Sequence, residues 1–245
     1  MICTATETHP GKCGKGKSDH EQEGQRSVMM KLEMPSRKGS ALKILCLGAH
    51  SDDIEIGCGG TILKLLEEHD RVDVYWVVFS AESIRAQEAR KSAGKFLTNA
   101  RKKEIVIKKF KDGFFPYTGG EIKEFFEELK KKFTPDIVFS HCRHDLHQDH
   151  RLINELTWNT FRDHLILEYE IVKYDGDIGN PNFFVQLDEE TCQRKIKYIL
   201  ESFKSQDQRG WFTKDVFFSV LRLRGLESNS PHKFAEGFFC RKAVL

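Results

Sequence analysis

The residues with the clearest catalytic potential lie in one short turn that contains His50, Asp52 and Asp53. An apolar segment of strand length, 43–48, precedes the turn, and a segment with apolar residues at helical spacing, 59–69, follows it. Unpaired charge beside a hydrophobic core is unfavourable, so two adjacent carboxylates at this place indicate that a cation binds there. The neighbouring imidazole is a common metal ligand.

A second cluster, residues 141–151, contains four of the ten histidines of the chain and two aspartates. It follows another strand-like segment, 135–140. Four imidazoles so close together would repel one another if all were protonated, and a shared metal or a proton-transfer role removes this conflict. The cluster therefore indicates chemistry rather than structure alone.

The segments around these clusters alternate between strand and helix patterns. Predicted strands at 43–48, 72–79, 105–107, 135–140 and 167–174 alternate with predicted helices at 59–69, 84–97, 121–132 and 149–163. This alternation predicts an α/β fold, a Rossmann-like and mostly parallel sheet flanked by helices. Beyond residue 175 the pattern weakens, and we expect strands at 183–187, 220–223 and 237–240 and a helix at 188–204.

The expected strand order brings the two clusters together. In a doubly wound sheet of order 3-2-1-4-5, the first and fourth strands are neighbours where the order reverses, and ligands bind beyond their carboxyl ends. The turn with His50, Asp52 and Asp53 follows the first strand, and residues 141–151 follow the fourth. We therefore expect the two clusters to face each other across one site.

Two histidines and one carboxylate with an open position form a catalytic zinc arrangement. His50 and Asp53 are three residues apart and can bind one ion from a single turn. We favour His150 as the third ligand, because a helix begins there and its N-terminus disfavours the imidazolium form. Asp52 then remains as general base, while zinc lowers the pKa of water and polarises a carbonyl oxygen, which makes amide hydrolysis feasible.

Other residues of the second cluster have supporting roles in this interpretation. His147 lies three residues before His150 and is a candidate general acid or oxyanion donor. Asp149 is expected to orient His147, as carboxylates beside metal sites fix histidine tautomers. For His141 and His144 the sequence leaves two roles open, contact with substrate or lining of the mouth.

Composition restricts the class of protein. The 245 residues fit one large domain, and a net charge of +2 gives no general argument for binding nucleic acid. No segment approaches the roughly 18 apolar residues that a membrane span needs, and no signal peptide is apparent. The seven cysteines include no CxxC pair, which favours reduced thiols and a cytoplasmic protein.

The chain divides into two parts by composition. Residues 1–39 are rich in Lys, Gly, Ser, Glu and Thr, and we expect a largely disordered extension with Met29 and Met30 as alternative starts. Residues 40–245 form the expected catalytic domain.

The two clusters resemble motifs of the LmbE-like or PIG-L zinc de-N-acetylases. Residues 49–53 and 57–61 resemble the first motif of that family, and residues 145–151 resemble the second. Weaker matches are Arg85-Ala86-Gln87-Glu88 and Ala235-Glu236-Gly237-Phe238, so that the resemblance spans 43–240. Ser51 departs from the usual proline of the first motif.

The resemblance implies a Rossmann-like sheet, a zinc ion (with another divalent metal as an option) and removal of acetyl from an N-acetylglucosamine-type sugar. By motif position it implies zinc binding by His50, Asp53 and His150, with Asp52 as base and His147 as acid or oxyanion stabiliser. It also implies a role for Arg85 in holding substrate, and His144 is a further candidate substrate-binding residue.

The absence of a membrane span favours a soluble sugar, sugar nucleotide or glycoside over the glycolipid of the family's membrane-bound branch. Relatives often form homo-oligomers. Two other functions remain open, a metal-dependent amidase or esterase for a non-sugar substrate and a non-catalytic carbohydrate-binding protein.

Overall fold

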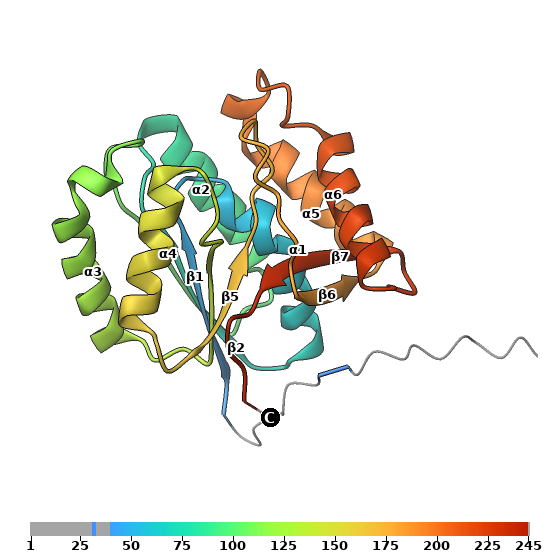
Figure 1. Ribbon diagram of the computed structural model, residues 1–245, viewed down its shortest axis with the longest axis horizontal. Coiled ribbons are helices and arrows are strands. Elements are labelled where there is room, and N and C mark those ends of the chain that lie inside the picture. The colour runs from blue at the N-terminus through green and yellow to red at the C-terminus, as the bar shows by residue number, and fades with distance from the viewer. Residues whose placement is uncertain (1–30, 33–39, 245) are drawn as a thin grey trace, which may run out of the picture. The chain divides into compact units, whose positions relative to one another are not determined.

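A seven-stranded sheet of order β3-β2-β1-β4-β5-β7-β6 forms the centre of the fold (Figure 1). The computed structural model describes residues 31–32 and 40–244, so the predicted extension, 1–39, lies almost wholly outside the described residues. The strands are β1 Leu42–Gly48, β2 Val72–Val78, β3 Lys102–Ile107, β4 Ile137–His141, β5 Leu165–Tyr169, β6 Phe183–Leu187 and β7 Phe234–Phe239.

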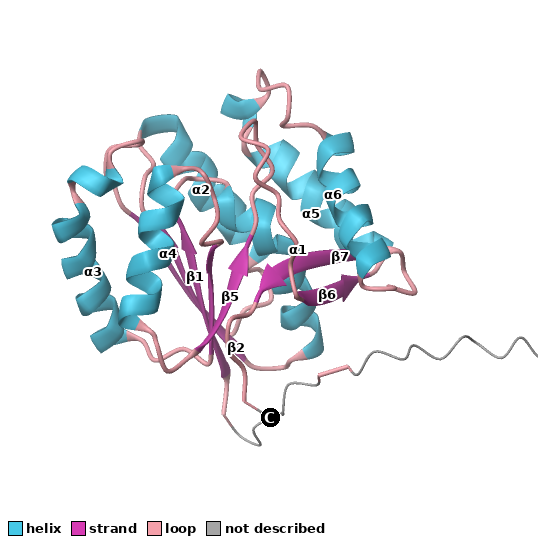
Figure 2. Cartoon of the chain, viewed as in Figure 1, coloured by secondary structure: helices cyan, strands magenta, loops and turns pink. Residues whose placement is uncertain are grey.

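Helices cover both faces of the sheet (Figure 2). They are α1 Asp53–Glu68, α2 Ser83–Phe96, α3 Gly119–Lys132, α4 Gln148–Thr160, α5 Glu189–Ser202 and α6 Lys214–Glu227, with short 3-10 turns η1 Phe115–Tyr117 and η2 Lys204–Gln206. Helices α3 and α4 pack together on one face, and α1 packs against α2 and α5 on the other (Figure 1). Within the described part of the chain, every helix is too short or too polar to cross a bilayer.

The predicted parallel sheet and its strand order are confirmed. Strands β3, β2, β1, β4 and β5 pair in parallel, and β1 lies between β2 and β4. The last two strands are antiparallel, since β7 pairs with both β5 and β6. The carboxyl ends of β1 and β4 are therefore neighbours, which places the turn at residues 49–53 beside residues 142–150.

Large aromatic side chains fill the core between the sheet and the α3–α4 layer. Phe79 follows β2 and stacks on Phe126 of α3, with ring centroids 5.3 Å apart. Phe115 of η1 is fully buried in the same cluster. Burial of this apolar surface stabilises the sheet and fixes the loops after β2 and β3 close to the carboxyl end of β1.

Several predicted boundaries differ from the structure: the strand expected at 105–107 begins at Lys102, the one at 167–174 is Leu165–Tyr169, and the one at 237–240 is Phe234–Phe239. Helix α1 begins at Asp53 instead of residue 59, because the Asp53 carboxylate carries the negative charge that a helix N-terminus favours. The strand expected at Val220–Leu223 is wrong, since these residues lie within α6. Thr213 caps that helix by accepting the backbone N–H of Val216, and buried Phe217 and Leu221 follow the helical period, which a four-residue apolar run cannot reveal.

Candidate metal centre and active site

The turn after β1 holds its polar side chains in a buried position. His50, Asp52 and Asp53 are 8%, 4% and 4% exposed. The backbone N–H of His50 donates to Asp53 Oδ2 at 2.6 Å, which closes the turn over the start of α1. This contact fixes the Asp53 carboxylate beside the His50 ring.

The second cluster reaches the same place from the loop between β4 and α4. His147 is the N-cap residue of α4, and its Nδ1 accepts the backbone N–H of Asp149 at 3.2 Å. His150 lies one turn further on and is 2% exposed. The N-cap contact therefore sets the direction in which α4 presents His150 to the turn after β1.

Three donor atoms converge between the clusters. His50 Nδ1 lies 3.0 Å from His150 Nε2 and 3.4 Å from Asp53 Oδ2, and His150 Nε2 lies 3.5 Å from the same carboxylate oxygen. A tetrahedral zinc with bonds of about 2.0–2.1 Å separates its ligand atoms by roughly 3.3 Å. The predicted ligands His50, Asp53 and His150 thus have the spacing that a tetrahedral divalent ion requires.

Two further carboxylates set the proton positions of the histidines. Asp145 Oδ2 lies 2.8 Å from His150 Nδ1, and Asp149 Oδ2 lies 3.3 Å from His50 Nε2. Each carboxylate accepts a hydrogen bond from one ring nitrogen, so in a neutral ring the lone pair lies on the other nitrogen, which faces Asp53. Burial lowers the pKa of His150 to about 3, which keeps that ring neutral.

Other sets of possible ligands overlap with this one: His147 with His50 and His150, His147 with His50, Asp112 and Asp149, and a set that replaces His50 with His141. Asp53, His141 and His150 also offer donor atoms close together. However, His141 Nε2 already accepts the backbone N–H of Ala49 at 2.9 Å. A metal at that nitrogen would leave a buried N–H without an acceptor, so of the two sets that contain Asp53 the one with His50 is better supported.

Asp52 lies beside this centre and contacts Arg85 of α2. Arg85 donates to Asp52 Oδ1 at 3.1 Å and to the Ser51 hydroxyl at 3.0 Å. Burial raises the pKa of Asp52, while the Arg85 guanidinium opposes this shift. The Ser51 hydroxyl thus accepts a hydrogen bond at the position where the family resemblance leads one to expect proline.

The expected contact of the Asp149 carboxylate with His147 is wrong. Only the backbone N–H of Asp149 reaches His147, whereas the carboxylate binds His50 and accepts the N–H groups of Gly113 and Phe115 at 2.6 and 3.1 Å. Although burial opposes ionisation, these contacts lower the pKa of Asp149. Asp149 therefore orients His50 and anchors the loop after β3.

The two remaining histidines of the cluster occupy different environments. His141 is fully buried behind the centre, while His144 is exposed on the loop between β4 and α4. His144 contacts Cys142 Sγ through its backbone N–H, at 3.4 Å, and the structure gives its side chain no contact with the centre. Its expected contact with substrate stays a prediction.

The two clusters lie within one region that matches a known family. Residues 45–161 match the model of the PIG-L family, described as GlcNAc-PI de-N-acetylase. Residues 45–161 are a PIG-L (LmbE-like) de-N-acetylase domain. The PIG-L domain thus contains the second half of β1, all of β2 to β4 and α1 to α4, and all residues of the centre described above.

Solved structures share the fold of the whole described unit. A conserved protein from Thermus thermophilus aligns with a TM-score of 0.66 at 19% identity, over 83% of this chain and 96% of that chain. N,N'-diacetylchitobiose deacetylase from Pyrococcus horikoshii, in complex with an inhibitor, aligns at 0.60 and 24% identity, over 82% and 84%. The 4-carboxy-2-hydroxymuconate hydratase from Pseudomonas putida aligns at 0.61 and 17%, over 83% and 98%. A deacetylase and a hydratase thus share this fold, so chemistry must be argued from the site.

Sequence reasoning assigned no role to two carboxylates of the PIG-L domain that contact the centre, Asp145, described above, and Asp112. Asp112, on the loop after β3, lies with Oδ1 3.0 Å from His50 Nε2, and its hydrogen bond with His50 lowers the pKa of Asp112 to about 2. Gly113 directly follows with φ of +78°, a conformation that favours glycine, so this glycine is a local signal of the loop shape.

We expect Asp145→Asn to weaken metal binding by about 10- to 100-fold, because an amide has one acceptor oxygen where the carboxylate has two, and the His147 N–H and Lys173 Nζ bind the oxygen that His150 does not. Zinc affinity of the metal-free protein, measured by competition with a chromophoric chelator, checks this result. Asp73→Asn is the matched control, since Asp73 is also buried and paired, with Arg101, but lies near the amino end of β2. Equal zinc affinity in Asp145→Asn and wild type would contradict the orienting role.

Proposed function

We propose that this protein is a zinc-dependent N-deacetylase that hydrolyses the acetamide of an N-acetylglucosamine-type amino sugar. The observation that carries the proposal is the convergence of His50 Nδ1, His150 Nε2 and Asp53 Oδ2 at 3.0–3.5 Å from one another, with Asp52 as the adjacent buried carboxylate. The match of residues 45–161 to the GlcNAc-PI de-N-acetylase family supports this reaction class.

The chemistry of the donor set fits a divalent metal. Two imidazoles and one carboxylate are typical ligands of catalytic zinc, and carboxylates on the outer nitrogens of both imidazoles complete the arrangement. His50, Asp53 and His150 would hold the ion. Bound there, zinc would supply Lewis acidity that favours ionisation of water and polarises the acetamide carbonyl.

Asp52 is the proposed general base. Its carboxylate is next to the ligand Asp53, and burial raises the pKa of Asp52, which makes it a better proton acceptor than an exposed aspartate. Asp52 removes a proton from the attacking water, and the same proton is then available for the amine that leaves the acyl carbon. Arg85 holds the carboxylate in place through its contact with Oδ1 at 3.1 Å.

His147 is the proposed donor to the carbonyl oxygen. Its Nδ1 accepts the N–H of Asp149, so in the neutral ring the proton lies on Nε2. Burial lowers the pKa of His147, which favours this neutral form. The Nε2–H of the neutral ring can donate a hydrogen bond to the carbonyl oxygen and stabilise the negative charge that develops there, while the ring keeps its proton.

A screen for acetate release tests the function. Metal-free protein reconstituted with zinc is incubated with N-acetylated monosaccharides, sugar nucleotides and glycosides, and with acetanilide and acetyl esters as non-sugar substrates. We expect release from at least one N-acetylglucosamine derivative, and removal of zinc with chelator should lower this rate by more than about 100-fold. Turnover of only the non-sugar substrates would favour a general amidase or esterase, and zinc-dependent sugar binding without acetate would favour a carbohydrate-binding protein.

A further inference from the structure

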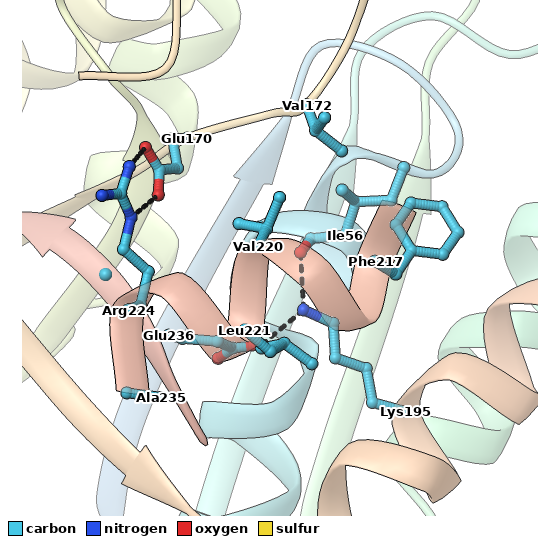
Figure 3. A pocket seen from close by; sticks show the side chains of 12 residues that line it. Ile56, Glu170, Val172, Lys195, Phe217, Val220, Leu221, Arg224, Ala235 and Glu236 are labelled. Atoms are coloured by element: carbon cyan, nitrogen blue, oxygen red, sulfur yellow. Dashed lines mark hydrogen bonds and ion pairs between the residues drawn. The ribbon is translucent and has the colours of Figure 1, made fainter. Parts of the chain in front are cut away.

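A buried ion pair from the C-terminal part of the chain contacts the backbone of helix α1 (Figure 3). Lys195 of α5 and Glu236 of β7 are 4% and 2% exposed in their side chains, with Nζ 2.6 Å from Oε1. Both residues lie beyond the region, 45–161, that matches the PIG-L family. Their place against α1 suggests a function for this distant segment.

The ion pair contacts backbone groups that a helix normally uses internally. Lys195 Nζ donates to the carbonyl oxygen of Ile56 at 2.6 Å. The Glu236 carboxylate accepts the backbone N–H groups of Gly60 and Thr61 at 2.8 and 2.7 Å. Ile56 and Gly60 are an i, i+4 pair of α1, so the ion pair binds both the acceptor and the donor of one helical turn.

This turn directly supports the candidate catalytic residues. The backbone N–H of Ile56 donates to the carbonyl oxygen of Asp52 at 3.1 Å. Two hydrogen bonds to the backbone of Ile56 therefore connect Lys195 to Asp52. Asp52 is adjacent to the metal-ligand candidate Asp53. If the proposed function holds, the position of the base and of one metal ligand depends on this turn of α1.

The local sequence of α1 is adapted to the ion pair. A Cβ atom added at Gly60 would lie 2.9 Å from Glu236 Oε1 and 2.5 Å from Leu187 Cδ1. Only glycine therefore lets the carboxylate reach the helix backbone at this position. The cavity beside the pair has about 30 Å³, about enough for one or two waters and too small for a sugar.

We propose that Lys195 and Glu236 are positioning residues, which act through the Ile56–Thr61 turn of α1 to fix Asp52 and Asp53 for metal binding and catalysis. The proposal rests on the proposed function for the roles of Asp52 and Asp53. The effect on the α1 backbone itself does not depend on that function.

The test compares Glu236→Gln with Glu170→Gln, two isosteric changes in buried ion pairs that line the same cavity (Figure 3). Glu170 binds Arg224 at 2.6 and 2.8 Å from the loop after β5, and the hydrogen bonds and ion pairs of this pair involve Gly179 and Glu227 and not α1. Zinc affinity is measured by chelator competition, and amide hydrogen exchange is measured for residues 52–61. We expect Glu236→Gln to weaken zinc binding about 10-fold or more and to accelerate exchange at Gly60 and Thr61, with neither change in Glu170→Gln.

Glu236→Gln leaves the buried Lys195 cation without its carboxylate, which can prevent folding. The double variant Lys195→Met/Glu236→Gln removes this cation and keeps the test valid if the single variant does not fold. We expect it to fold and still to show weakened zinc binding and faster exchange in α1. Wild-type zinc affinity and exchange in the double variant would overturn the proposal, as would equal effects of Glu236→Gln and Glu170→Gln. If the wild type bound no zinc, the proposed function would fail, and the exchange rates alone would still decide the action on α1.

Discussion

Replacement of Asp52 by Asn is expected to abolish turnover while zinc stays bound. The amide is isosteric and its oxygen can still accept from Arg85, but it cannot take a proton from water. A positioned general base contributes about 10²–10⁴-fold to rate, so kcat/KM should fall by about 10³-fold, or roughly 4 kcal/mol of transition-state stabilisation. Zinc affinity should change little, because Asp52 is not among the three converging donors.

The measurement pairs acetate release with the zinc content of the purified variant. Asp112→Asn is the matched control, since this carboxylate also lies close to His50, but on the Nε2 side and with a side chain that is 59% exposed. We expect a far smaller loss of activity from Asp112→Asn. An Asp52→Asn protein that kept zinc and turned over at the wild-type rate would exclude Asp52 as the base.

The sequence predicts the fold and the meeting of the two clusters because both depend on local patterns. The strand at 43–48 and the strand at 135–140 are recognisable from their own residues, and the rule for doubly wound sheets makes them neighbours. The resulting approach of His50 to His150 across 100 residues was thus accessible without a structure. The sequence predicts a start of α1 that is too late, because the acidic residues of its first turn resemble a polar loop.

Partners that are distant in sequence were not accessible in this way. The Asp149 carboxylate lies 99 residues from His50 and 36 from Gly113, and nothing in the spacing of the second cluster distinguishes these contacts from one with nearby His147. Glu236 binds Gly60 across 176 residues, in a strand pair that follows no βαβ rule. Such contacts depend on side-chain rotamers and on how the antiparallel strands β6 and β7 pack against the rest of the sheet. Hydrophobic periodicity carries no information about either.

Replacement of His50 by Ala is expected to abolish metal binding as well as turnover. The variant removes one of three donors and leaves only Asp53 Oδ2 and His150 Nε2, which are 3.5 Å apart. We expect zinc affinity to fall by more than about 100-fold, beyond the loss that follows from disturbing an orienting carboxylate. Zinc at 100 times its Kd stabilises a native protein by about 2.7 kcal/mol, so the zinc-dependent rise in Tm should also disappear.

Two other histidine variants make this result specific. His144→Ala should keep the wild-type zinc affinity, because the ring is exposed and apart from the converging donors. His141→Gln retains an acceptor for the Ala49 N–H, and it should also keep zinc if His50 is the third ligand. The opposite pattern, with zinc lost in His141→Gln and kept in His50→Ala, would move the ion to the Asp53–His141–His150 set. Zinc and activity retained in His50→Ala and His141→Gln alike would remove the proposed centre altogether, since Asp53 and His150 alone leave a divalent ion with too few protein ligands.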